Sequence, residues 1–355
     1  MYWNLKTHAV LETVVRGAVL TALGFAMMLT HPARAVTTAE LVCDVLRHEV
    51  AAASDSSAGL LFGVLDSLRA EPRIWVEGAV SADDEFRLGC PTAKPILAYL
   101  ILSCRIPIEA RITRWFSERD GYTRASDIQV LHLLLNSSGI RDYVPLIPMD
   151  PDSAVSANRT IELAYRHQAL LFDPGQGFEY SNTNANLLGI ILTLETGHSV
   201  DSLIHSRFAA VAPTLRYDDG HGRYPRGYPR PWPYHWSCPG YGGGLIGSAA
   251  DAMRAFAWIA SQPEFVQITR WSKPDGSPDR AETDHRLGLG LFGRRDLAGC
   301  GEAAFYDGDI GPCQMILARV RGHIFYIATT HRVSLGHLNE VFSRLVASCI
   351  AAGED

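Results

Sequence analysis

Apolar positions recur at helical spacing in some parts of the chain and in short, nearly continuous runs in others. The helical spacing predicts helices over residues 38–53, 96–102, 128–135, 161–171, 187–194, 248–259 and 338–351. The short runs predict strands over residues 60–65, 73–80, 287–292, 313–320 and 323–329. Strands therefore lie near both ends of the chain, and its middle is helical.

This order of elements favours an α/β protein of the α+β type. We expect an antiparallel sheet flanked by N- and C-terminal helices, with an all-helical lobe inserted into it. The sheet lobe would take about residues 36–90 and 285–355, and the helical lobe and its loops about 91–284.

The first 35 residues have the pattern of an export signal. Lys6 and Arg16 precede an apolar run over residues 17–29, and Ala33-Arg34-Ala35 is a small-x-small cleavage site. We expect cleavage near Ala35, an exported (periplasmic or extracellular) domain over residues 36–355, and no membrane span in the mature chain. An uncleaved N-terminal anchor and a cytoplasmic protein are the alternatives.

Composition removes several function classes. A net charge of -6 gives no basic footprint, which argues against nucleic-acid binding. The seven cysteines include no C-x-x-C pair and the histidines show no ligand spacing, so we expect neither metal nor cofactor. Cys300 and Cys313 flank a strand-like turn and could pair, whereas Cys43, Cys104 and Cys349 fall in apolar helices and are expected in the core. The oligomeric state is open.

The most informative stretch is the Pro/Gly turn that leads into Tyr180-Ser181-Asn182, just ahead of a predicted helix. A phenol can relay a proton and an amide can hold a substrate carbonyl. Tyrosine and asparagine are also ordinary turn residues, so the pair needs partners from elsewhere in the chain. Lys94 is one candidate, because lysine is the basic side chain whose proton can be tuned, and the chain has only three lysines.

Several segments together resemble the serine β-lactamase and penicillin-binding-protein-like superfamily, in particular its class C and D-aminopeptidase/esterase-like branch. The resemblance covers about residues 55–350 and rests on segments 86–94, 128–139, 174–182, 242–251 and, partially, 306–308. It implies a sheet lobe and a helical lobe with the active site between them. It also implies acyl transfer through a covalent intermediate, with Tyr180 and Asn182 as the family's Tyr-x-Asn pair and Lys94 as its lysine.

The nucleophile departs from the family pattern of Ser-x-x-Lys, because Pro91 stands three residues before Lys94. In one interpretation Cys90 attacks, since positions four apart share a helix face and a helix N-terminus beside an ammonium lowers a thiol pKa. In a second, Thr92 attacks from a poor angle. In a third, the site is catalytically silent and binds a ligand or partner.

The last family motif, Lys or His two residues before glycine, is replaced by Tyr306-Asp307-Gly308. Aspartate there would repel a substrate carboxylate, which leaves esters, neutral amides, cationic substrates or transfer to an amine. A plain surface turn explains Asp307-Gly308-Asp309 equally well. The aromatic loop at 224–241 falls where the family places part of the cleft rim, and its Trp232, Tyr234, His235 and Trp236 could contact an aromatic or lipid-like acyl group. The alternative, which the composition favours, is a loop packed on its own rings.

The sequence thus predicts a hydrolase or acyltransferase for a small-molecule or peptide-like ester or amide. Cys90 would be the nucleophile, Lys94 its base and Tyr180 the proton relay. Asn182, Tyr306, Asp307 and Gly308 would bind substrate, and the N–H of Cys90 with one near Asp309 would hold the oxyanion. The alternatives are a silent binding protein and an intracellular biosynthetic transacylase.

Overall fold

The computed structural model describes residues 37–53, 56–88, 92–147, 149–150, 152–217, 235, 237–277, 285–310 and 313–353. The chain divides into two units, residues 1–41 and 42–355. The predicted export signal lies outside the described residues. Helix α2 spans Thr38–Ala52, and its Val42 and Leu46, which belong to the second unit, are buried.

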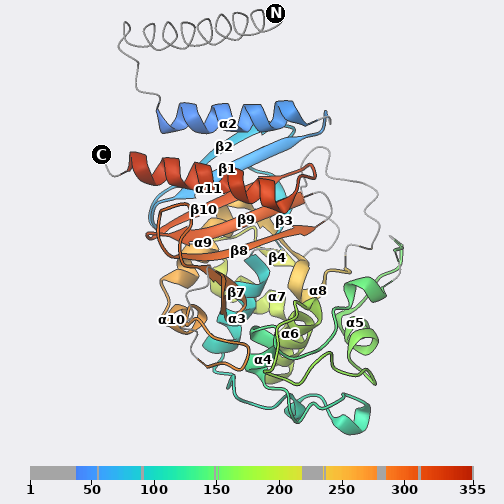
Figure 1. The fold of residues 1–355 in the computed structure, drawn as a ribbon. Helices are drawn as coiled ribbons and strands as arrows, with labels where there is room; N and C mark the ends of the chain where they lie inside the picture. The colour runs from blue at the N-terminus through green and yellow to red at the C-terminus, as the bar shows by residue number, and fades with distance from the viewer. Residues whose placement is uncertain are drawn as a thin grey trace, which may run out of the picture. The chain divides into compact units, whose positions relative to one another are not determined.

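A seven-stranded antiparallel sheet is built from both ends of the second unit (Figure 1). Its order is β2 (Arg73–Gly78), β1 (Gly59–Leu65), β10 (His323–Thr329), β9 (Cys313–Val320), β8 (Ala303–Ile310), β7 (Leu291–Arg294) and β6 (His285–Gly288). Strand β1 joins the two ends, because Phe62 pairs with Trp75 on one side and with Ile327 on the other. The predicted fold class is confirmed.

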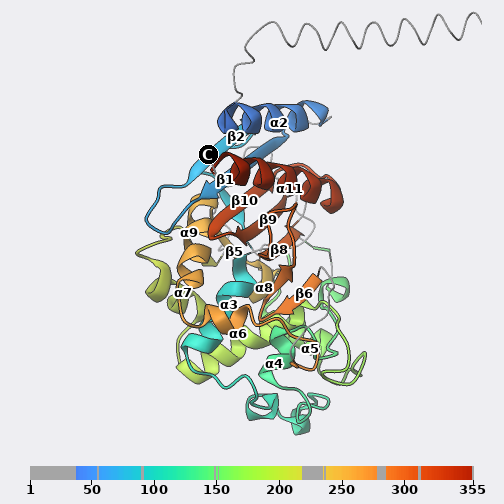
Figure 2. The same ribbon diagram turned by 60° about the vertical axis from the view of Figure 1, so that its left-hand side comes forward.

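The two faces of the sheet carry separate cores. Alternate residues of a strand point to opposite faces, so Phe62 and Phe325 pack under Phe342 of helix α11 (Leu335–Ala352), which lies along one face (Figure 2). Leu61 and Tyr326 enter the second core with helix α9 (Ala249–Ala260). This second face supports the helical region and the candidate site.

The helical region lies between β3 and β6 in the chain. Besides α9 it contains α3 (Lys94–Ser103), α4 (Val130–Leu134), α5 (Ala157–Ala164), α6 (Asn182–Thr196), α7 (Val200–Phe208), α8 (Gly240–Gly243) and α10 (Phe265–Ile268), with 3-10 turns η2 (Ile112–Arg114), η3 (Glu118–Asp120) and η4 (Val144–Leu146). Helix α3 is buried from Lys94 to Ile101, as a helix at the centre of a domain must be.

Two predicted elements differ clearly from the structure. The predicted helix over 161–171 is wrong beyond Ala164, where α5 ends and the chain becomes a loop. The predicted strand over 287–292 is two strands, β6 and β7, joined at Leu289 and Gly290. Gly290 has φ +66°, and a Cβ there would lie 2.6 Å from the carbonyl oxygen of Lys94, so this turn presses against α3.

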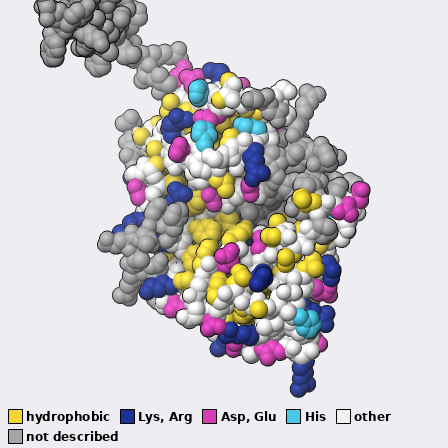
Figure 3. All heavy atoms as spheres, turned by 45° about the vertical axis from the view of Figure 1, so that its right-hand side comes forward, with side chains coloured by type: hydrophobic (Ala, Val, Ile, Leu, Met, Phe, Trp, Pro, Cys, Tyr) yellow, Lys and Arg dark blue, Asp and Glu magenta, His cyan; other side chains and the backbone are white. Residues whose placement is uncertain are grey.

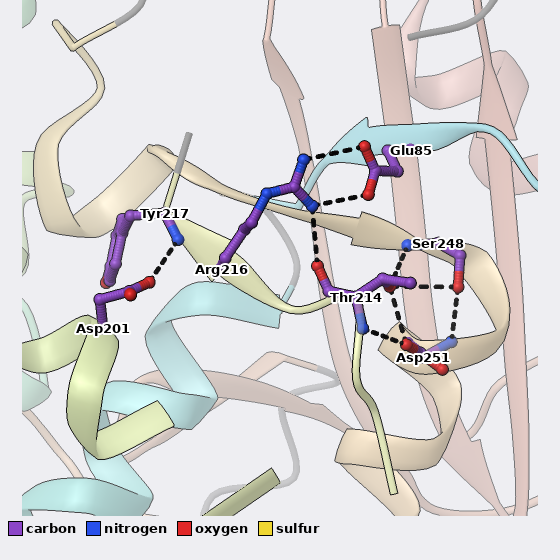
Figure 4. A network of polar contacts seen from close by, with 7 residues as sticks. All are labelled: Glu85, Asp201, Thr214, Arg216, Tyr217, Ser248 and Asp251. Carbon is purple, nitrogen blue, oxygen red and sulfur yellow. Dashed lines mark hydrogen bonds and ion pairs between the residues drawn. The ribbon is translucent and has the colours of Figure 1, made fainter. Parts of the chain in front are cut away.

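A small second sheet, β3 (Glu85–Arg87), β5 (Leu245–Ser248) and β4 (Arg216–Tyr217), stands where the chain enters the candidate site. The Arg216 guanidinium donates to both oxygens of Glu85 at 2.6 and 3.1 Å (Figure 4). Nearby, Asp251 Oδ2 accepts from both the backbone N–H and the hydroxyl of Thr214. These contacts fix β3, which leads directly to residues 89–94.

Among the described cysteines, Cys300 and Cys313 are both free thiols, so the pairing considered for them is wrong for this structure. Cys43, Cys104 and Cys349 are half-buried rather than fully in the core. No single helix in the described ranges is long and apolar enough to cross a membrane. Only α6 and α7 together reach that length and composition, and they are bent by 79° to each other.

Candidate active site

The turn before helix α3 contains one residue more than an α-helical turn. The carbonyl oxygen of Leu88 accepts from Thr92 N at 3.0 Å and from Ala93 N at 3.2 Å, and the second bond spans five residues, as in a π turn. The regular helix begins at Lys94, two residues before the predicted start at 96, with Ala93 as its N-cap. Cys90 and Pro91 themselves lie outside the described residues.

Thr92 is only 1 % exposed, and its hydroxyl has no hydrogen-bond partner among the described residues. Thr92 as a nucleophile stays a prediction.

Lys94 is 5 % exposed and lies between two tyrosine rings. Its Nζ donates to the carbonyl oxygen of Gly242 at 3.2 Å and stands 5.0 Å from the ring centroid of Tyr180 and 5.6 Å from that of Tyr306. Ring faces attract an ammonium electrostatically. The structure thus brings together Lys94, Tyr180 and Tyr306, which come from α3, the loop before α6 and β8.

Tyr180 and Asn182 are joined to a carboxyl group that the sequence analysis did not consider. The Tyr180 hydroxyl donates to Asn182 Oδ1 at 3.2 Å. Asn182 in turn donates twice to Asp142, from its backbone N–H to Oδ1 at 3.1 Å and from Nδ2 to Oδ2 at 3.2 Å. Burial raises the pKa of Asp142, while the hydrogen bonds from Val144 and Asn182 and the nearby Lys94 charge act to lower it.

Asn182, which is predicted to bind substrate, makes its side-chain contacts here with Tyr180 and Asp142. A carboxylate only accepts hydrogen bonds, so Asp142 fixes the amide with Nδ2 toward itself and Oδ1 toward Tyr180. Both ends of the amide are then engaged within the protein. Asn182 holds the Tyr180 hydroxyl in this structure.

The loop that carries Asp142 is tied to the start of α6. Asn136 Oδ1 accepts from Ser181 N at 3.2 Å and from Asn184 Nδ2 at 3.0 Å, and Ser138 Oγ donates to Asn184 Oδ1 at 2.7 Å. Asn136 has φ +54°, a conformation that asparagine tolerates better than most residues. The Ser-Ser-Gly and Tyr-x-Asn segments therefore form one hydrogen-bonded unit.

A cavity of about 10 Å³ lies beneath Lys94, close to the smallest volume that admits one water molecule. It is lined by Lys94, Leu97, Leu133, Leu134, Asn136, Ser181, Asn184, Ala185 and Leu188. This cavity is too small for a substrate.

Strand β8 contributes the third segment of the site. Tyr306 is 3 % exposed and stacks on Phe292 of β7, with ring centroids 5.1 Å apart. Asp307 is the next residue of the strand, so its side chain points to the opposite face, where it accepts from Asn339 Nδ2 of α11 at 3.1 Å. The surface-turn alternative is wrong, because Asp307, Gly308 and Asp309 pair with β9.

Three further predictions meet the structure only in part. Asp309, proposed near the oxyanion hole, pairs with Arg332 at 3.6 Å. Of the rim aromatics in loop 224–241, Trp232, Tyr234 and Trp236 lie outside the described residues, whereas the Nδ1 of His235 contacts Ser237 Oγ at 2.8 Å. No group of three or more His, Cys, Asp or Glu side chains that could hold a metal occurs in the described ranges.

Sequence reasoning missed Asp142 and Phe178. Asp142 was visible as an acidic residue in the Ser-Ser-Gly loop, but its role depends on a contact with a residue 40 positions away. Phe178 was visible in the turn before Tyr180, and its ring is 42 % exposed beside Phe292. On one face of the protein, hydrophobic side chains gather in a hollow (Figure 3).

Solved structures with the same fold include several amide-cleaving enzymes. The D-amino acid amidase of Ochrobactrum anthropi SV3, in complex with L-phenylalanine, has a TM-score of 0.74 at 21 % identity, over 89 % of this chain and 99 % of its own. A D-stereospecific amidohydrolase from Streptomyces sp. has a TM-score of 0.66 at 17 % identity, over 81 % and 93 %. A beta-lactamase/D-alanine carboxypeptidase from Pseudomonas syringae has a TM-score of 0.68 at 14 % identity, over 87 % and 98 %.

No curated protein sequence matched the chain. The model of the beta-lactamase family matches residues 76–339, which is most of the chain and includes every segment of the candidate site. The chain belongs to the beta-lactamase family.

Proposed function

We propose that the protein is a hydrolase that cleaves an ester or a neutral amide through a covalent acyl intermediate. The observation that carries this proposal is the position of Lys94, whose ammonium lies against the Tyr180 and Tyr306 rings at the start of α3. A lysine and a tyrosine at one site can divide between them the proton transfers to and from a nucleophile and a leaving group. Membership of the beta-lactamase family supports the same reaction type.

Cys90 is the proposed nucleophile, and the π turn supports it. A π turn takes one residue more than an α turn. With this extra residue, a nucleophile four positions before Lys94 can replace the family's serine, which stands three positions before its lysine. The helix N-terminus and the Lys94 ammonium would both favour the thiolate. The thiolate sulfur forms a bond to the substrate carbonyl carbon, and the bond to the alcohol or amine breaks.

Tyr180 is the proposed proton relay for that step. The leaving alcohol or amine takes its proton through the Tyr180 hydroxyl, which Asn182 holds in place. A water molecule then attacks the thioester, which restores the thiol and releases the carboxylic acid. The backbone N–H of Cys90 and one near Asp309 remain the proposed oxyanion donors.

A neutral substrate fits the charges around the site better than an anionic one. The family's Lys or His is replaced by the neutral Tyr306, and the acidic group beside Tyr180 and Asn182 is Asp142, whereas Asp307 points to the opposite face of the sheet. The amidase and amidohydrolase with the same fold make a small amide or ester the first class to assay.

Turnover of p-nitrophenyl acetate and of phenylalanine amide by the purified chain tests the proposal. We expect hydrolysis by the native protein and no hydrolysis by Cys90→Ala. Tyr180→Phe should lose at least about a hundredfold in turnover, which is the size usual for the loss of a general acid or base. If the native protein turns over neither substrate yet binds them, the silent binding protein is the correct alternative. Unchanged turnover in Cys90→Ala would place the nucleophile elsewhere.

We also propose export with cleavage after Ala35. The charged start, apolar run and Ala-x-Ala site support it. N-terminal sequencing of the protein from its natural host should begin at Val36, and a retained Met1 on cytoplasmic protein would contradict export.

A further inference from the structure

Three aromatic rings lead from the buried Lys94 ammonium toward solvent. Tyr306 lies beside Lys94, Phe292 stacks on Tyr306 with an interplanar angle of 28°, and Phe178 meets Phe292 edge to face at 6.2 Å and 71°. We call Phe178, Phe292 and Tyr306 the aromatic wall. Its members come from β8, β7 and the turn before Tyr180.

Exposure increases along the aromatic wall with distance from the lysine. Tyr306 is buried, Phe292 is half-buried and Phe178 is 42 % exposed. Phe178 also stands two residues before Tyr180, so the exposed ring is next to the reacting groups in the chain. An exposed phenyl ring in this position, at the end of a continuous aromatic surface, has the chemistry of a ligand contact.

We propose that the aromatic wall is the subsite for the acyl side chain, and that it takes an aromatic or large apolar group attached to the carbonyl carbon. The proposal rests on the proposed function, because it places the carbonyl near Lys94 and Tyr180. The side chain of the substrate then extends along Phe292 to Phe178. Aromatic rings favour offset and edge-to-face contacts with a further ring, and Phe178 keeps a large part of its surface available for one.

A structural role for Phe178 is the competing explanation. Its edge contact with Phe292 could simply hold the turn that carries Tyr180. Loss of such a brace would lower activity toward every substrate alike. Loss of a subsite lowers activity toward large apolar acyl groups selectively, so a ratio of two substrates separates the explanations.

The first measurement is kcat/KM for p-nitrophenyl phenylacetate and p-nitrophenyl acetate, which differ only in the phenyl group. We expect the native ratio to favour phenylacetate, and Phe178→Ala to lower this ratio about tenfold or more, within the 10- to 200-fold usual for apolar pocket contacts. Phe178→Tyr, which keeps the ring, should retain the ratio. Leu171→Ala is the matched control, since Leu171 is 45 % exposed in the segment leading to the same turn.

The second measurement needs no turnover. Binding of phenylacetamide and of acetamide is followed by ligand-observed NMR in the native protein and Phe178→Ala. Tighter binding of phenylacetamide that Phe178→Ala abolishes supports the subsite even if neither ester is hydrolysed, which would refute only the proposed hydrolase. Equal effects on both esters, or an unchanged preference in Phe178→Ala, would overturn the subsite while leaving the hydrolase standing.

Discussion

Asn182 donates two hydrogen bonds to Asp142, one from its backbone N–H and one from its side-chain amide. This double contact decides which end of the amide faces Tyr180, and the Tyr180 hydroxyl donates to the oxygen that remains. Asp142 therefore acts on the proposed proton relay through Asn182. It is a positioning residue rather than a catalytic one.

Replacing Asp142 by asparagine should impair the proposed proton relay through Tyr180 while leaving substrate binding unchanged. The amide introduced by Asp142→Asn can turn to donate as well as accept, so the orientation of Asn182 is no longer fixed. A hydrogen bond to a charged group contributes about 1.5–3 kcal/mol, so we expect kcat to fall roughly 10- to 100-fold. KM should change little if Asp142 acts only through Asn182. A rise in KM at constant kcat would instead indicate direct substrate contact.

Asp142 should also set an acid limb in the pH profile. Burial raises its pKa, so the carboxyl takes up a proton at a higher pH than an ordinary aspartate and then no longer only accepts from Asn182. We expect kcat of the native protein to fall on acidification at a higher pH than an ordinary aspartate would produce, and this limb to be absent in Asp142→Asn. An identical acid limb in both proteins would assign it to another group.

The same shift predicts a stability difference with a definite sign. A raised pKa means that the folded protein binds the Asp142 proton more readily than the unfolded chain, so protonation favours folding. The free energy of unfolding of the native protein should therefore rise relative to that of Asp142→Asn as the pH is lowered. The rise begins near the pKa of Asp142 in the folded protein and is complete below the pKa of Asp142 in the unfolded chain. Urea unfolding of the pair across the acidic range measures it, and a difference of the opposite sign would contradict the burial argument.

The ion pair of Glu85 and Arg216 joins a buried carboxylate to a guanidinium that is 35 % exposed. Glu85 accepts from the guanidinium through both oxygens, so Arg216→Ala removes the partner of a buried acceptor and should cost about 1–3 kcal/mol. The matched control is Arg47→Ala, which breaks an exposed pair with Asp44 and should cost at most about 1 kcal/mol. Equal unfolding free energies for the two variants would contradict the claim that the contact between Glu85 and Arg216 stabilises β3.

Gly290 and Gly197 make a second matched pair. Both have positive φ, +66° and +70°, but a Cβ at 290 would lie 2.6 Å from the Lys94 carbonyl oxygen, whereas one at 197 meets nothing within 4 Å. Gly197→Ala should therefore show backbone strain alone, about 1–3 kcal/mol. Gly290→Ala should lose more than this and also lower activity, because the clash displaces the start of α3. Thermal unfolding and ester turnover of both variants give the comparison.

The sequence predicts the interior strands with long apolar runs and misses β8, whose second half is polar. Strands β1, β9 and β10 lie at the centre of the sheet, and their continuous apolar runs make them recognisable. Strand β8 was missed because Asp307-Gly308-Asp309 has the composition of a turn. Only pairing with β9 and the contact of Asp307 with Asn339 explain polar residues there.

Residues of the candidate site that belong to a family motif could be predicted from the sequence. Residues whose role depends on contacts between distant segments could not. Lys94 and Tyr180 were identified from motif spacing, and the structure places them together. The extra residue before Lys94 was visible only as a departure from Ser-x-x-Lys, because a π turn has no sequence signature of its own. Asp142 required knowledge of how two loops meet.

The site of acylation tests the central claim most directly. The native protein is treated briefly with p-nitrophenyl acetate, quenched in acid and analysed by intact mass and peptide mapping, with Cys90→Ala and Cys104→Ala in parallel. We predict one acetyl group on the peptide that contains Cys90 in the native protein and in Cys104→Ala, and none in Cys90→Ala. An acetyl group that persists in Cys90→Ala, or one that maps to another residue, would contradict the account.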